Sequence, residues 1–232
     1  MTIWNRMTNA VATAVRGGTL ADIIGQMTEQ ALQPGGPQTD VRFTIALIAL
    51  CAKMARSDGA VTVDEVEAFK RIVHVPPAEE ANVRRVFDLA KQDVLGFEAY
   101  ARQIGKLLAG EPQLLRDVVE ALCVIAAADG VLHEKEDEFL KTAAEYLGVR
   151  DSEMRYIRSL FVRDAASPYE VLELLPSASN AAIKARHRKL VIAHHPDKLI
   201  GRGVPAEFVR VAEKRLAAIN AAYDTVARER GL

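Results

Sequence analysis

The sequence predicts an all-α protein with two domains. Half of its 232 residues are hydrophobic and only 6% are aromatic, a composition that suits closely packed helices. Apolar residues recur at helical spacing, and no convincing run of alternating valine, isoleucine or threonine indicates a strand. This length suits two domains, or one large one. We divide the chain into an N-terminal segment with a linker, a helical body, a short linker and a C-terminal domain, at 1–39, 40–161, 162–167 and 168–232.

The first segment is predicted to be a weakly amphipathic helix, followed by the proline- and glycine-rich linker 33–38. A membrane-spanning helix needs about 20 mostly apolar residues. Polar residues such as Asn5, Arg6 and Arg16 interrupt this segment, and no signal-peptide pattern is present. We therefore expect no transmembrane anchor and a cytoplasmic location. A helix packed on its own domain is favoured over an interfacial anchor.

The body is predicted to consist of successive helices with an internal repeat. Residues 55–61 match residues 126–132 at an offset of 71, and each copy follows an apolar helix, at 43–54 and 114–125. An acidic helix start follows each copy. Two helical hairpins of this kind would pack as a pseudo-twofold bundle.

The acidic turns of this repeat have two interpretations. They could form a surface for a divalent cation or a basic partner, through Asp58, Glu65, Asp129 and Glu136. Alternatively, Gly59 and Gly130 end helices in the left-handed conformation, and Thr62 caps the next helix with Glu65. The spacing does not fit an EF-hand. The structural interpretation is favoured, and no metal site is predicted.

Other chemistry is not indicated. Cys51 and Cys123 lie in apolar helical stretches without metal-type spacing, so we expect buried, reduced thiols. No phosphate-binding loop, nucleophile elbow or pair of catalytic carboxylates is evident. We predict that the protein is not an enzyme, with no catalytic residues and no cofactor.

Three helices are predicted in the C-terminal domain. Ser167 and Glu170 form a capping box at the start of a short helix, 168–175. Ser179 or Asn180 caps a second helix that ends near His194. Pro205 opens a third helix, whose apolar stripe consists of Phe208, Ala212, Leu216, Ile219, Tyr223 and Val226. The two long helices would pack antiparallel, braced by the short one.

The tripeptide His195-Pro196-Asp197 follows the second helix. Proline lacks an N–H and disfavours a helical conformation in the residue before it, so we expect the helix to end here and a loop to follow over 198–204. A carboxylate held on a stiff, exposed loop suits a charge-assisted hydrogen bond to an arginine of a partner. Taken alone, the tripeptide would be read as a helix stop with solvated charges.

Residues 167–230 resemble the J-domain of DnaJ-type cochaperones, and they are most similar to the DjlA-like branch in the run 194–199 and the Gly203-x-Pro205 turn. The resemblance implies stimulation of ATP hydrolysis by a DnaK-type chaperone. It also implies that DnaK is contacted through His195, Pro196 and Asp197, with steering by Lys184, Arg188 and Lys189. One departure is His187, where many J-domains have a tyrosine.

Residues 40–161 resemble the TerB-like domain, which is named for tellurite-resistance proteins and also precedes the J-domain in DjlA-like chains. The combination implies a chaperone partner and client proteins, with a body that selects clients, forms a homodimer or localises the protein. The alternative is a stress-response scaffold or metal-sensing protein with a degenerate J-domain. Residues 168–232 carry a net charge of +4 and the remainder −5. This distribution favours an acidic protein partner and gives little support to nucleic-acid binding.

Overall fold

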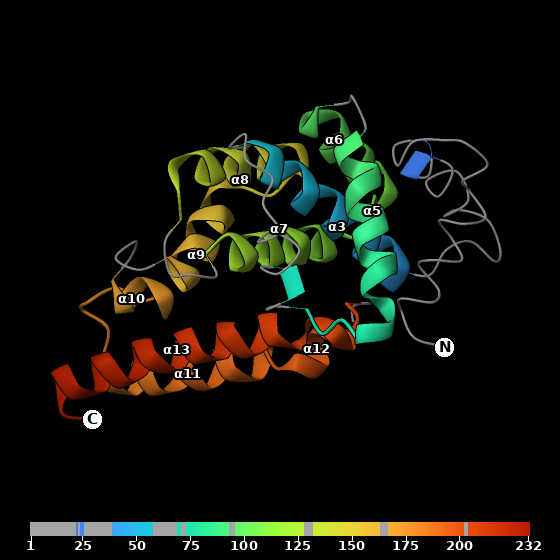
Figure 1. Ribbon diagram of the computed structural model, residues 1–232. Coiled ribbons are helices and arrows are strands. Elements are labelled where there is room, and N and C mark those ends of the chain that lie inside the picture. The colour runs from blue at the N-terminus through green and yellow to red at the C-terminus, as the bar shows by residue number, and fades with distance from the viewer. Residues whose placement is uncertain are drawn as a thin grey trace.

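The computed structural model describes residues 22, 24–25, 39–57, 69–70, 73–92, 96–127, 132–162, 167–201 and 204–232. Most of these residues lie in helices, and none of them lies in a strand (Figure 1). The prediction of an all-α fold is therefore confirmed. The predicted N-terminal helix and the linker 33–38 lie almost wholly outside the described residues.

The body, residues 39–161, is built around helix α3. Its helices are α3 (Thr39–Ser57), η1 (Pro77–Glu79), α5 (Glu80–Gln92), α6 (Phe97–Leu107), α7 (Pro112–Ala126), α8 (Glu134–Tyr146) and α9 (Asp151–Phe161). Helix α3 contacts α5, α6, α7 and α8, and every residue from Phe43 to Ala52 is buried. A helix buried on all sides is a core helix. The two apolar helices of the repeat are thus α3 and α7, which pack against each other.

Only part of the repeated turn can be compared with its prediction. Asp58, Gly59, Thr62 and Glu65 lie outside the described residues, as do Asp129 and Gly130. Glu136 is described, and its Oε2 accepts the backbone N–H of His133 at 3.0 Å at the start of α8. This carboxylate therefore caps its own helix, as the structural interpretation requires of a helix-start glutamate.

Both cysteines are free and buried, as predicted. Burial raises the pKa of the Cys123 thiol to about 12, and it raises the pKa of Cys51 as well. Neither thiol is ionised at neutral pH, so both behave as small apolar core residues.

The C-terminal domain, residues 167–232, begins with the predicted capping box. The Ser167 hydroxyl accepts the N–H of Tyr169, and Glu170 accepts the N–H of Ser167. The short helix α10 (Pro168–Val171) nevertheless ends earlier than the predicted 175. Glu173 takes a positive φ of 53°, and the Leu174 N–H bonds back to Tyr169 O, which closes the helix. Leu175 consequently stays 73% exposed and does not join the predicted apolar face.

Two long helices follow and pack antiparallel. They are α11 (Asn180–Ala193) and α13 (Val209–Arg230). Ser179 is the N-cap of α11, and its hydroxyl accepts the Ala182 N–H. Ile183 and Leu190 are buried against Ile219 and Val226 in one apolar cluster, which confirms the predicted pairing.

The segment after the tripeptide is a helix, so the predicted loop over 198–204 is wrong in its first half. Helix α12 covers Pro196–Gly201. Proline at a first helical position has no N–H to leave unsatisfied, and the Lys198 N–H bonds to His195 O. Leu199 is buried and holds this short helix in place. Val204 and Pro205 then lead into η2 (Ala206–Phe208), which opens α13 as predicted.

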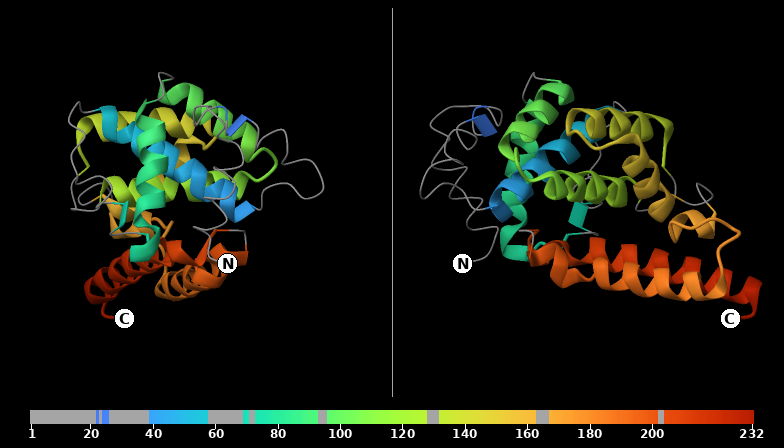
Figure 2. Two further views of the ribbon diagram at one scale, coloured as in Figure 1. Left: turned by 45° about the vertical axis from the view of Figure 1, so that its right-hand side comes forward. Right: turned by 180° about the vertical axis from the view of Figure 1, so that it is seen from behind.

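The C-terminal domain packs directly on the body. Figure 2 shows the α11–α13 pair along one side of the body, and α13 contacts both α7 and α9. The fully buried Phe208 ring lies 5.1 Å from that of Phe43 and 6.4 Å from that of Phe69. The first residues of α13 therefore belong to the core of the body, and the rest of the helix belongs to the core of its own domain.

Candidate partner-binding surface

The tripeptide stands exposed where α11 ends. The side chain of His195 is 55% exposed and that of Asp197 is 86% exposed. His195 Nδ1 accepts the Asp197 N–H at 3.3 Å and lies 3.4 Å from Asp197 Oδ2. Proline fixes the backbone between these two side chains. The carboxylate is thus presented to solvent from a rigid helix start, as predicted, although from a helix and not from a loop.

A basic face adjoins the tripeptide on α11. Lys184, Arg188 and Lys189 are all exposed. Lys184 and Arg188 are four residues apart and lie on the same side of the helix. None of the three forms an ion pair with any residue that the structure describes. Their charges are therefore available to attract an acidic surface.

Two exposed apolar side chains near this surface were not predicted. Ile192 is 61% exposed and stands four residues after Arg188, close to the tripeptide. Ile200 on α12 is 45% exposed. The sequence carries a signal for Ile192, because it falls off the buried stripe of Ile183 and Leu190. The candidate partner-binding surface thus combines the positive charges of α11, the Asp197 carboxylate and a small apolar area.

His187 has a role within the C-terminal domain. Its ring stacks on Tyr223 with centroids 4.1 Å apart and an interplanar angle of 12°. Its Nε2 lies 2.9 Å from Asn220 Oδ1. Both contacts are to α13, so the ring helps to hold the two long helices together. His187 therefore has a structural role within this domain.

A buried ionic cluster behind the tripeptide was missed by sequence reasoning. Arg215 on α13 forms a two-pronged ion pair with Glu120 on α7, and Asp117 Oδ1 lies 3.8 Å from Arg215 Nη2. These three side chains are 2–5% exposed. Arg215 Nη1 also lies 2.8 Å from Nδ1 of His194, the residue before the tripeptide.

The charge state of this cluster follows from its surroundings. Burial lowers the pKa of Arg215 to about 10, and the nearby Asp117 carboxylate opposes that decrease. Arg215 is therefore still protonated at neutral pH. Because Arg215 can only donate hydrogen bonds, Nδ1 of His194 accepts. The signal in the sequence was an arginine at helical spacing between Ala212 and Ile219, within the buried stripe of α13.

No metal-binding arrangement is seen in the described part of the chain. In the described ranges, no group of three or more His, Cys, Asp or Glu side chains is placed to hold a metal ion. Likewise, no described helix is both long enough and apolar enough to cross a membrane.

Comparison with known proteins identifies both domains. Residues 44–159 match the family model described as tellurite resistance protein TerB, and residues 167–230 match the DnaJ domain. No solved structure matches the chain at a significant level.

Similar proteins span most or all of the chain. A protein named co-chaperone protein DjlA from Photobacterium profundum is 27% identical over 84% of this chain and 80% of its own length. Proteins of the same name from Yersinia pestis and Escherichia coli K12 are 25% and 22% identical over 100% of this chain and 99% of their own lengths. With its TerB domain followed by a C-terminal DnaJ domain, the chain belongs to the DjlA-like family of DnaJ-type cochaperones.

Proposed function

We propose that this protein stimulates ATP hydrolysis by a DnaK-type chaperone. The observation that carries the proposal is the exposed Asp197 carboxylate, held by Pro196 at a rigid helix start beside a basic face. The DnaJ domain and the relatives named as co-chaperones support the same partner. The protein itself carries out no covalent chemistry and acts by binding.

Each part of the surface has a distinct task in this proposal. Lys184, Arg188 and Lys189 attract an acidic patch of DnaK, which speeds association and sets orientation. Asp197 accepts a charge-assisted hydrogen bond from an arginine of DnaK once the surfaces meet. His195 and Pro196 fix the position of that carboxylate. The body selects clients, pairs with a second copy or localises the protein.

Single-turnover ATP hydrolysis by DnaK, measured with and without the full chain, tests the proposal. We expect the hydrolysis rate to rise with the concentration of this protein and to saturate. A rate that stays at the basal level at every concentration would reject the proposed function. It would favour the alternative of a stress-response scaffold that has lost its coupling to DnaK.

Replacing Arg188 by alanine should weaken association with DnaK, while bound protein should still stimulate ATP hydrolysis by DnaK. The side chain is exposed and forms no ion pair with a described residue, so its charge acts mainly through long-range attraction. The concentration for half-maximal stimulation should rise, and its dependence on salt should become less steep. The maximal rate should stay near that of the wild type. Loss of the maximal rate itself would give Arg188 a larger role than steering.

Calcium, magnesium and zinc should show no tight site in calorimetric titrations of the protein. Glu136 accepts a backbone N–H as a helix cap, and the other candidate ligands of the acidic turns fit the same structural pattern in the sequence. Sub-micromolar binding that disappears in Glu65→Ala or Glu136→Ala would contradict this expectation. It would move the proposed role of the body towards metal sensing.

We also propose a cytoplasmic location. Charged and amide side chains interrupt the first thirty residues, and no uncharged apolar run in the sequence approaches the length of a span. After cell fractionation, the protein should be recovered without detergent. Recovery mainly in carbonate-washed membranes would show that the N-terminal segment inserts into the bilayer.

A further inference from the structure

The interface between the two domains combines an apolar part and an ionic part. Leu199, Val204, Phe208, Val211 and Ala212 of the C-terminal domain belong to the same buried cluster as the residues of α3. This apolar contact brings the start of α13 against α7. It also removes water from the Arg215–Glu120 pair, whose side chains are 5% and 2% exposed. Electrostatic interactions strengthen when water is excluded.

The ionic part reaches the tripeptide through one side chain. The guanidinium group of Arg215 contacts both domains. It binds both carboxylate oxygens of Glu120 in the body, and it donates a hydrogen bond to Nδ1 of His194 at the end of α11. His194 is the C-cap of α11, and the next residue begins the tripeptide. The position at which α11 ends is thus connected to α7 through the guanidinium group of Arg215.

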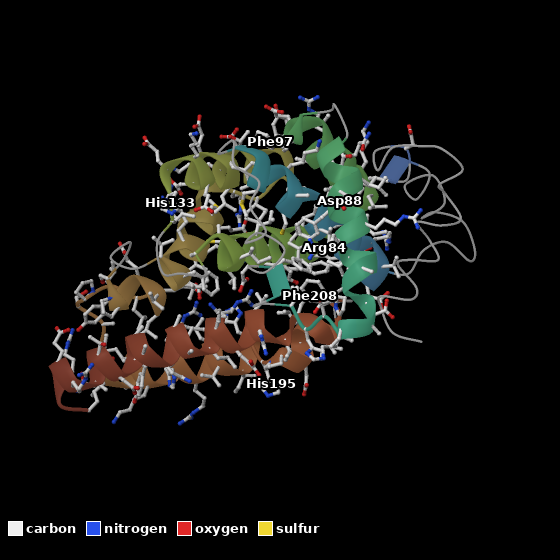
Figure 3. All side chains as sticks on the ribbon, viewed as in Figure 1. Arg84, Asp88, Phe97, His133, His195 and Phe208 are labelled. Carbon is white, nitrogen blue, oxygen red and sulfur yellow. The ribbon has the colours of Figure 1, made fainter. Side chains whose placement is uncertain are left out.

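The candidate DnaK-binding surface faces away from this interface. Figure 3 shows His195 on the side of the α11–α13 pair that points away from the body, and Phe208 on the side that meets it. Asp197 and the basic face stay exposed while the domains are packed together. The body therefore leaves the partner-binding surface uncovered.

We propose that Arg215 is a positioning residue for the tripeptide. By linking His194 to Glu120, it holds the C-terminal domain on the body in one orientation, with the tripeptide directed outward. A DnaK molecule that binds at the tripeptide is therefore held at a fixed angle to the body. The orientation of the two domains does not depend on DnaK, whereas the effect on ATP hydrolysis rests on the proposed function.

A distance measurement tests the orientation without DnaK. Spin labels are placed on the full chain by Glu134→Cys in the body and Asp224→Cys on α13, both exposed positions. Cys51 and Cys123 are buried, and a sample with only these native thiols provides the labelling background. We expect one narrow distance distribution, which broadens in Arg215→Met and stays narrow in Arg228→Met, the matched control at the exposed end of the same helix. A distribution that is equally narrow in Arg215→Met would overturn the proposal.

The hydrolysis assay tests the link to the tripeptide. Glu120→Gln changes only the body and keeps the shape of the side chain, so it serves even if Arg215→Met folds poorly. We expect the concentration for half-maximal stimulation of DnaK to rise about threefold to tenfold, with little change in the maximal rate. An unchanged half-maximal concentration in a folded Glu120→Gln protein would overturn the role of this ion pair.

His194 offers a matched pair of substitutions. His194→Gln keeps a hydrogen-bond acceptor for Arg215, whereas His194→Phe keeps a flat ring and loses the acceptor. Stimulation should be nearly normal in the glutamine variant and weakened in the phenylalanine variant. Equal stimulation by the two variants would contradict the positioning role. If the wild type itself gives no stimulation, the proposed function fails, and the spin-label distances still decide whether Arg215 holds the two domains together.

Discussion

Replacing Asp197 by asparagine is expected to abolish stimulation of DnaK while the protein stays folded. The substitution keeps the shape of the side chain and removes its charge. A charge-assisted hydrogen bond is roughly twice as strong as a neutral one, so contact with an arginine of the partner would be severely weakened. The measurement is single-turnover ATP hydrolysis by DnaK over a range of concentrations of the variant.

The fold should be almost unaffected by this substitution. The Asp197 side chain is 86% exposed, and its Oδ2 lies 3.4 Å from Nδ1 of the nearby His195. Surface substitutions typically change the free energy of unfolding by about 0.5 kcal/mol or less. Helix content and thermal unfolding should therefore match the wild type. A folded Asp197→Asn protein that stimulates DnaK as well as the wild type would refute the mechanism proposed for the tripeptide.

Replacing Phe208 by alanine is expected to destabilise the whole protein. The ring is fully buried and packs edge-on against Phe43 and Phe69, which belong to the body. Truncating a buried phenylalanine costs about 3–5 kcal/mol, because apolar contacts are lost and a cavity remains. The free energy of unfolding, measured by denaturant titration, should fall by that amount. Leu175→Ala provides the control, since Leu175 is 73% exposed.

The shape of the unfolding transition shows whether the two domains unfold together. Because Phe208 lies in the chain of the C-terminal domain and in the core of the body, both domains should lose stability together. A two-state transition would show the same midpoint with probes in either domain. If Phe208→Ala destabilised only the C-terminal domain and left the body unchanged, the packing of the two domains would be weaker than the structure indicates.

Local sequence patterns determined the helix starts and the buried helix faces of this protein. The helix caps at Ser167 and Ser179 are formed with neighbouring residues, so they could be recognised from short stretches of sequence. The apolar stripes of α11 and α13 follow from helical periodicity in the same way. The exposed tripeptide depends mainly on a proline that ends one helix and begins another. Those interactions act over a few residues, and the sequence displays them directly.

The exact extent of the short helices depended on packing. Helix α10 ends early because Glu173 adopts a left-handed conformation, and α12 forms where a loop was predicted because Leu199 is buried against the body. Neither outcome follows from residue preferences alone. Short helices gain most of their stability from tertiary contacts, since the first turn is unfavourable to form by itself.

Only the tertiary structure revealed the interface between the two domains. Arg215 and Glu120 are 95 positions apart in the chain, and residue type alone would assign an arginine to the surface. Phe208 was predicted to be buried, but its aromatic neighbours come from the body and not from its own helix pair. Periodicity indicates which face of a helix is covered, and it carries no information about what covers it. A buried charge is stable only beside an opposite charge, and that partner is brought there by the packing of distant helices.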